Sequence, residues 1–270
     1  MDRNEIALMY SGGLDTTYMA LQLAKEFQKV HLLTFCNGVC VNPDASKRHV
    51  QILRNKFGMD KFEHSIIPVE EILSFLKKGL SKDVANYKTP LLFDLCCRMS
   101  MEVATILYCL PRGIRYVTDG NNPNTQGEMF IQQTRYLNAA AEFFSRYGIE
   151  TIRSYTILDS RDKIIRRLNK AGINTGIKWL RFLGITTQLF TQPFCLWAPV
   201  AFLFTSGLRK MPFIKYFNLS VEDAIRYRKE KEKLAIPFID YFKSDYTMSS
   251  ERPCTGKLSR FFKCISPKCS

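Results

Sequence analysis

The residues best suited to chemistry lie near the start of the chain, in the run Ser11-Gly12-Gly13-Leu14-Asp15-Thr16-Thr17. A short apolar run precedes it and apolar residues at helical spacing follow it, so we predict a tight loop between a strand and a helix. The two glycines would let the backbone approach an anion closely, because they carry no Cβ. Backbone N–H groups, hydroxyl groups and the positive end of the helix could then hold phosphate oxygens.

This loop has no lysine, which distinguishes it from a Walker P-loop. It resembles the signature Ser-Gly-Gly-x-Asp-(Ser/Thr) of the PP-loop ATP pyrophosphatase superfamily (adenine nucleotide α-hydrolase-like, HUP). The resemblance implies that the loop binds the β- and γ-phosphates of ATP, which leave as pyrophosphate. It also implies that Asp15 helps to hold Mg²⁺, since a bare carboxylate would repel phosphate. The candidate nucleotide-binding residues here are Tyr10, Ser11, Gly12, Gly13, Leu14, Asp15, Thr16 and Thr17.

Two later segments are further candidates for the nucleotide site. Asp119-Gly120-Asn121 follows a predicted strand and resembles a Gly-containing loop that the superfamily places near the α-phosphate. The family's Thr-Gly-His-Asn form has a His that is absent here, so no role of that His is carried over. The alternative is a plain Asn-Pro-Asn turn. Thr34 and Phe35 end the second predicted strand, where the superfamily contacts adenine, and this assignment rests on position alone.

The segment from Phe93 to Arg98 opens a predicted helix with two adjacent cysteines, Cys96 and Cys97. It resembles the Cys-x-x-Cys-(Lys/Arg) helix start of sulfur-transfer and base-modification branches, although the match is partial. A cation at a helix start is disfavoured by the helix dipole unless it meets an anion. We therefore expect Arg98 to touch ATP phosphate or the substrate. The candidate catalytic residues are Asp15, Cys97 and Arg98.

The chain has nine cysteines, and no secretory signal precedes the first predicted strand. We therefore predict a cytoplasmic protein with reduced thiols. Three cysteines from distant segments could bind a [4Fe–4S] cluster or Zn²⁺. The alternative is a set of buried or exposed thiols, and Cys109 in an apolar helix is assigned to the core. The metal-ligand candidates are Cys97, Cys195 and Cys254, with Cys264 and Cys269 as rivals.

The first part of the chain alternates strand and helix patterns, which predicts parallel βαβ units. We predict a nucleotide-binding domain over residues 1–160, an open five-stranded parallel sheet of Rossmann-like type with helices on both faces. Ligands of such sheets bind beyond the carboxyl ends of the strands. The expected strands are Ile6–Tyr10, Val30–Phe35, His64–Val69, Ile114–Thr118 and Glu150–Ile157. The expected helices are Asp15–Gln28, Pro43–Phe57, Val69–Lys78, Leu92–Leu110 and Gln126–Tyr147.

Residues 161–270 are predicted to be a basic, mainly helical substrate-binding region with a Cys-rich tail. Helices are expected at Asp162–Ala171 and Ser220–Leu234, the second capped by Ser220. This part holds 21 Lys and Arg against 8 Asp and Glu, whereas residues 1–160 hold 18 against 17. The excess favours a polyanion partner over a merely solvated basic surface. The uncharged stretch Leu183–Leu208 is expected to be core or a docked surface, because its prolines and glutamines make a poor membrane span.

These patterns predict an enzyme that uses ATP and Mg²⁺. A substrate oxygen attacks the α-phosphate, pyrophosphate leaves, and sulfur or nitrogen from a sulfur or ammonia donor then displaces AMP. We expect thiolation of tRNA bound by the basic region. The same chemistry on a small molecule (sulfur insertion, amidation or nitrile formation) is the first alternative, and a non-catalytic nucleotide-binding or sulfur-carrier scaffold is the second. The oligomeric state, including a homodimer, stays open.

Overall fold

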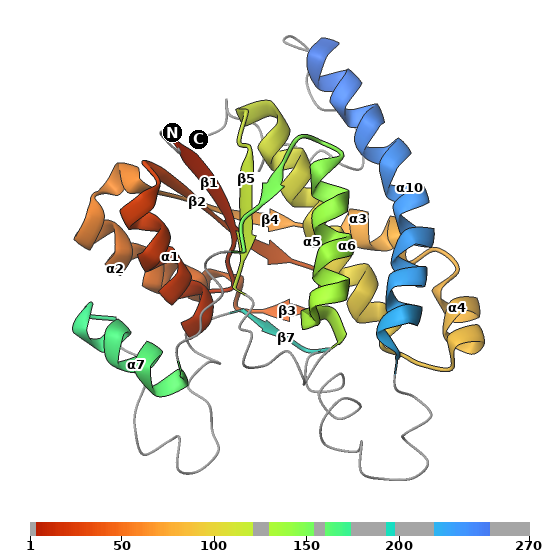
Figure 1. Cartoon of the computed structure of the whole chain (residues 1–270), viewed down its shortest axis with the longest axis horizontal. Coiled ribbons are helices and arrows are strands. Elements are labelled where there is room, and N and C mark those ends of the chain that lie inside the picture. The colour runs from red at the N-terminus through yellow and green to blue at the C-terminus, as the bar shows by residue number, and fades with distance from the viewer. Residues whose placement is uncertain (1–3, 121–129, 154–159, 174–192, 198–218, 249–270) are drawn as a thin grey trace.

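The computed structural model describes residues 4–120, 130–153, 160–173, 193–197 and 219–248. Its centre is a five-stranded sheet in the order β4-β2-β1-β5-β6, and every pairing in it is parallel (Figure 1). This confirms the predicted α/β fold class. The strands are β1 Glu5–Met9, β2 Lys29–Cys36, β4 Phe62–Pro68, β5 Tyr116–Asp119 and β6 Glu150–Thr151.

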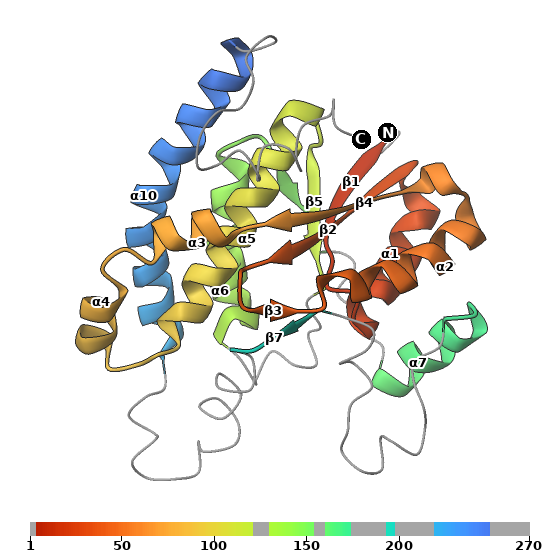
Figure 2. The same ribbon diagram turned by 180° about the vertical axis from the view of Figure 1, so that it is seen from behind.

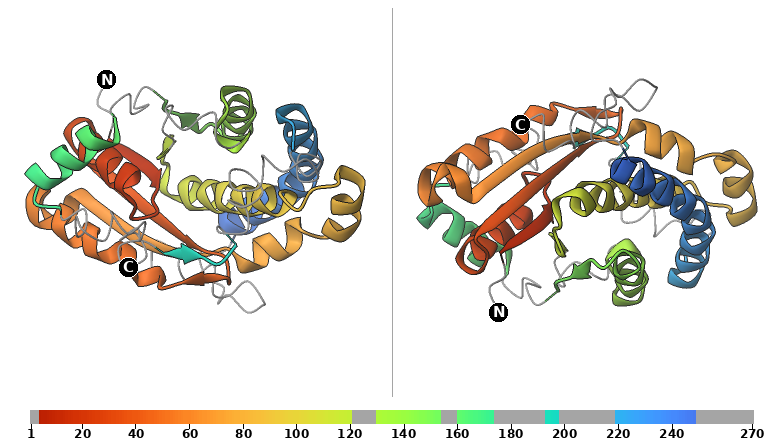
Figure 3. Two further views of the ribbon diagram at one scale, coloured as in Figure 1. Left: turned by 90° about the horizontal axis from the view of Figure 1, so that it is seen from below. Right: turned by 90° about the horizontal axis from the view of Figure 1, so that it is seen from above.

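Helices cover both faces of this sheet (Figure 3). One face carries α1 Leu14–Glu26, α2 Lys47–Phe57 and α7 Arg161–Lys170. The other carries α3 Glu70–Leu76, α5 Leu92–Cys109, α6 Thr134–Ser145 and α10 Val221–Met248. The chain leaves β1 toward β2 over the first face and returns to β5 over the second. The strand order therefore reverses between β1 and β5, and such a switch point is where α/β sheets bind ligands.

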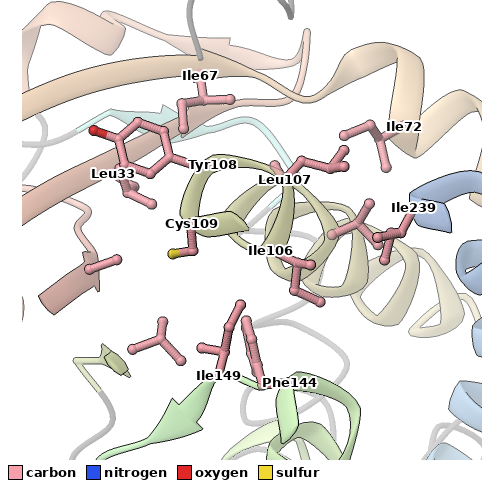
Figure 4. Close-up of a cluster of buried hydrophobic side chains, with 14 of the residues drawn as sticks. Leu33, Ile67, Ile72, Ile106, Leu107, Tyr108, Cys109, Phe144, Ile149 and Ile239 are labelled. Atoms are coloured by element: carbon pink, nitrogen blue, oxygen red, sulfur yellow. The ribbon is translucent and has the colours of Figure 1, made fainter. Parts of the chain in front are cut away.

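The strands of the sheet alternate their side chains between two hydrophobic cores. Ile6 and Leu8 of β1 pack toward α1, whereas Ala7 packs toward α5. Figure 4 shows the second core, in which side chains of α5 meet Leu33 of the sheet and Ile239 of α10. Both faces of β1 are buried, which explains its continuous apolar sequence.

Several elements differ from the sequence-based expectations. A second, two-stranded antiparallel sheet of β3 Cys40–Val41 and β7 Phe194–Cys195 was not predicted, because two-residue strands carry no periodicity. Helix α4, Leu80–Tyr87, was not predicted either. The helix expected from Gln126 begins at Thr134, after a 3₁₀ turn at Phe130–Gln132. The helix expected to end at Leu234 continues through Pro237 to Met248.

The uncharged stretch Leu183–Leu208 lies mostly outside the described residues, and only 193–197 are placed. Within the part of the chain that the structure describes, no helix is both long enough and apolar enough to cross a membrane. The expected strand after Glu150 likewise runs into residues 154–159, which are not described.

The first half of α10 is held by charged groups. Its N-terminus has the predicted cap, since the Asp223 N–H donates to Ser220 Oγ at 3.0 Å. The guanidinium of Arg228 is fully buried and lies 2.7 Å from the carboxylate of Glu102, which is also fully buried, on α5. Arg228 also pairs with Glu232 at 2.8 Å and donates to the Tyr136 hydroxyl of α6 at 3.2 Å. This network joins α5, α6 and α10.

Replacement of Arg228 by Met should lower the free energy of unfolding by about 3–5 kcal/mol, because it leaves the Glu102 carboxylate buried with less compensating charge. The double variant Arg228→Met/Glu102→Gln should regain most of this loss. Urea unfolding followed by circular dichroism measures both. Arg226→Met is the control, since the Arg226–Asp223 pair is solvent-exposed and should contribute less than about 1 kcal/mol. Equal losses of unfolding free energy in Arg226→Met and Arg228→Met would contradict the prediction that the buried ion pair matters more than the exposed one.

Candidate nucleotide-binding site

The predicted loop joins β1 to α1 at the switch point of the sheet. Gly12 has φ of +77°, a left-handed backbone conformation that favours glycine. Gly13 is the N-cap of α1 and offers no side-chain cap to the first turn of the helix. The hydroxyls of Ser11 and Thr16 lie 3.1 Å apart, and the Gly13 N–H donates to Ser11 Oγ at 3.2 Å. The Thr16 hydroxyl also donates to the Gly13 carbonyl at 3.2 Å. These hydrogen bonds order the loop at a helix N-terminus, which attracts anions.

Other predicted residues of this loop lie behind it. Tyr10 and Thr17 are buried, and their side-chain oxygens are 3.1 Å apart. Their hydroxyls bond inside the protein, so these side chains support the loop and do not present oxygen to its open side. Leu14 and Asp15 are partly exposed in the first turn of α1. Asp15 is thus the carboxylate that the helix start places next to the loop.

His49, which was not predicted from the sequence as a site residue, anchors the loop from α2. Its Nδ1 lies 2.9 Å from the carbonyl oxygen of Gly12 and 3.4 Å from Thr17 Oγ1. A carbonyl only accepts hydrogen bonds, so Nδ1 carries the proton. This bond turns the Gly12 carbonyl inward, and in a trans peptide the following Gly13 N–H then points the opposite way. A lone histidine in an amphipathic helix gave no signal of this role.

The end of β5 packs tightly against the same helix start. A Cβ on Gly120 would lie 2.3 Å from Thr16 Cγ2 and 3.3 Å from Thr16 Cα. A Cβ at this position would collide with the Thr16 methyl group, so the close approach requires glycine while Thr16 is present. The predicted nucleotide-binding segments at Gly12–Thr16 and at Asp119–Gly120 are therefore neighbours in space. Asn121, the last residue of the second segment, lies outside the described residues.

Gly120→Ala should therefore destabilise the protein by about 1–3 kcal/mol through overpacking. The compensating change Thr16→Ser removes the methyl group nearest to the new Cβ and keeps the hydroxyl. We expect Gly120→Ala/Thr16→Ser to recover much of the loss, as measured by chemical unfolding. Thr16→Ser alone is the control. If the double variant were no more stable than Gly120→Ala, the Thr16 methyl would not be the obstacle.

Arg98 and Asp119, both predicted from the sequence, meet at the strand ends. The Arg98 guanidinium forms an ion pair with Asp119, and its Nε donates to Glu102 at 3.0 Å. The helix begins at Leu92, so Arg98 lies in the second turn of α5 and not at its start, and two carboxylates of the protein itself compensate its charge. Glu102 also pairs with Arg228, so it links Arg98 to the buried ion-pair network of α10.

A small cavity of about 40 Å³ lies beside this pair at the carboxyl ends of β1 and β5. This volume suits one or two water molecules and is far below that of a nucleotide pocket. Arg98, Arg153 and Asp119 are among the residues that line it, and most of the others are apolar, such as Val117 and Phe144. The cavity therefore combines three charged residues with a mainly apolar wall at the switch point of the sheet.

Thr34 and Phe35, the predicted adenine contacts, point to different surroundings. The Thr34 hydroxyl is buried and donates to the Tyr10 carbonyl at 2.9 Å. It also lies 2.9 Å from His64 Nε2. Phe35 packs against the hydrophobic core beneath α5. Thr34 therefore fixes the end of β1.

The buried environment of His64 lowers the pKa of its imidazole to about 4, and positive charge on Arg54 and Lys47 contributes. An unfolded histidine has a pKa of about 6.5, so between these values the unfolded chain binds more protons. Stability should fall as the pH falls from about 6.5 to about 4. Between pH 7 and pH 5, the free energy of unfolding of the wild type should fall by about 1–2 kcal/mol more than that of His64→Gln, because glutamine does not titrate. Urea unfolding at both pH values measures this difference, and parallel losses would exclude the effect.

Two of the three predicted metal-ligating cysteines are brought together. The side-chain amide of Asn37 donates to Cys97 Sγ at 3.3 Å and lies 3.6 Å from Cys195 Sγ. Burial raises the pKa of the Cys97 thiol to about 12, which favours the protonated form. In the described ranges, no three His, Cys, Asp or Glu side chains are arranged to hold a metal ion. The third candidate, Cys254, and its rivals Cys264 and Cys269 lie outside the described residues.

The chain matches no protein-family model and no curated protein sequence. Among solved structures, a predicted subunit of tRNA methyltransferase from Methanocaldococcus jannaschii is 16% identical, with a TM-score of 0.42, over 72% of this chain and 96% of that one. The U34-tRNA thiolase NcsA from Methanococcus maripaludis, with its [4Fe-4S] cluster, is 13% identical, with a TM-score of 0.45, over 96% of this chain and 78% of that one.

Proposed function

We propose that this protein is an ATP pyrophosphatase that adenylates an oxygen atom of its substrate. The observation that supports this most directly is the loop of residues 11–17. It combines a left-handed Gly12, the uncapped N-terminus of α1 and the hydroxyls of Ser11 and Thr16 at the switch point of a parallel sheet. These groups suit the pyrophosphate part of ATP.

In this proposal the remaining groups of the strand edge serve the α-phosphate and the metal ion. Asp15 is a partly exposed carboxylate in the first turn of α1 and would hold Mg²⁺, which neutralises phosphate charge when bound. Arg98 and Asp119 lie at the end of β5, next to the loop. We propose that they orient the α-phosphate and the attacking oxygen. The protein's contribution is then placement and charge, and not a covalent step.

We further propose that the substrate is tRNA and that the oxygen is replaced by sulfur. The charge of the chain supports a polyanion, because residues 161–270 carry 21 basic against 8 acidic side chains. In the proposed domain division, residues 161–270 follow the nucleotide-binding part of the chain and select the substrate. Cys97 and Cys195 would be the sulfur-handling residues, with Cys254 as the third ligand of a cluster or Zn²⁺. The described residues supply only two of these thiols, so no reaction step is assigned to a metal.

Incubation with ATP, Mg²⁺, tRNA and a sulfide donor should yield AMP and pyrophosphate, which chromatography of labelled ATP separates from ADP and phosphate. Asp15→Asn should lower pyrophosphate release by about 100-fold or more, because the metal loses a carboxylate ligand. Asp60→Asn is the matched control, since Asp60 is exposed and remote in sequence from the loop. Release of ADP instead of AMP, or full activity of Asp15→Asn, would contradict the assignment.

The same assay distinguishes a tRNA substrate from a small-molecule substrate. A tRNA substrate predicts pyrophosphate release that depends on tRNA and binding that weakens steeply with salt. It also predicts a thiolated nucleoside in the digested tRNA when a sulfide or persulfide donor is present. Turnover that is indifferent to RNA would favour the small-molecule alternative.

A further inference from the structure

Two cysteines outside the proposed nucleotide site lie in direct contact. Cys36 ends β2 and Cys40 begins β3, and their sulfur atoms are 2.8 Å apart. This is closer than two unbonded sulfur atoms normally approach. Both side chains are partly exposed, and neither takes part in a disulfide. The pair is therefore a contacting dithiol that small reagents can reach.

The turn between the two cysteines is fixed by a hydrogen bond at Cys36 and another within the turn. The Val69 N–H donates to the Cys36 carbonyl at 2.7 Å. Within the turn, the Val39 N–H donates to Asn37 Oδ1 at 3.2 Å, and Gly38 adopts φ of +80°. These bonds hold the backbone of the turn in one conformation. The contact between the two sulfurs is thus a property of the folded turn.

Further thiols surround this pair on the second sheet. Cys40 is the direct antiparallel partner of Cys195. The Leu196 N–H donates to the Val39 carbonyl at 3.0 Å, so Cys40 and Cys195 face each other at a non-hydrogen-bonded position, where opposite side chains lie closest. Asn37 lies between Cys195 and Cys97. Figure 2 shows β3 and β7 side by side, near the end of the sheet to which β2 runs.

We propose that Cys36 and Cys40 are a redox-active dithiol that a peroxide oxidises to an intramolecular disulfide. One thiol loses its proton and its sulfur attacks a peroxide oxygen, so that the O–O bond breaks, water leaves and a sulfenic acid forms. The second sulfur then attacks the sulfenic sulfur, the S–O bond breaks and a second water leaves. The two thiols are oxidised by two electrons and hydrogen peroxide is reduced. Cys195 and Cys97 are not required for either step.

Peptide mapping of the full-length, reduced protein tests this directly. Trypsin cleaves after Lys29 and Lys47, so Cys36 and Cys40 lie on one peptide, while Cys97 and Cys195 lie on two others. After treatment with stoichiometric hydrogen peroxide and alkylation of the remaining thiols, peptide 30–47 should be lighter by two hydrogens and carry no alkyl group. Dithiothreitol should restore both alkylation sites.

Variants distinguish this dithiol from general oxidation. Cys36→Ser and Cys40→Ser should each abolish the lighter peptide and leave one thiol that oxidises further to sulfinic acid. Cys109→Ser should leave the result unchanged, because Cys109 is fully buried in the core. The proposal would be overturned if wild-type peptide 30–47 stayed fully alkylated, or if peroxide instead joined it to the peptide of Cys97 or Cys195. Because the readout needs no ATP, it stands or falls independently of the proposed function.

Discussion

The site depends on the position of β1 inside the sheet. This strand pairs with β2 on one side and with β5 on the other, and helices bury both of its faces. The loop that follows it is therefore fixed from several directions: His49 of α2 holds the Gly12 carbonyl, Thr34 of β2 holds the Tyr10 carbonyl, and Gly120 closes against Thr16. An anion-binding loop built from backbone groups needs such support, because the direction of each backbone N–H group is set by the conformation of the chain itself.

The parts of this arrangement that are adjacent in the chain can be predicted from the sequence. A strand, a glycine-rich loop and a helix start are neighbours in the chain, so Gly12, Gly13 and Asp15 identify the loop without knowledge of the rest. The alternating pattern likewise predicted the parallel sheet, since buried parallel strands are continuous apolar runs. What the sequence could not provide were contacts between distant segments. Nothing in the sequence around His49 indicates that it meets the loop, the tight packing of Gly120 against Thr16 is not visible in the sequence, and a two-residue strand such as β3 has no detectable period.

The placement of charge also differs from what the sequence suggested. Arg98 was expected to need an external anion at its helix start, and the fold supplies Asp119 and Glu102 instead. The reason is non-local, since Asp119 arrives with β5 and the charge of Glu102 is in turn balanced by Arg228 of α10. A long ion-pair network thus runs from the strand ends into the C-terminal helix. Any ligand that engages Arg98 or Asp119 enters a site whose charges are already compensated.

The proline within α10 has a consequence for how that helix is held. Pro237 has no N–H, so the carbonyl of Lys233 lacks its usual intrahelical donor. Before this proline, α10 is held by ion pairs of Arg228 and Lys231 and by buried apolar contacts of residues such as Tyr227; after it, apolar side chains such as Ile239 pack against the core. Loss of an ion-pair partner should therefore weaken the first stretch, whereas conditions that weaken apolar burial act on both stretches. One continuous helix thus has a charge-dependent part followed by a part packed through apolar side chains.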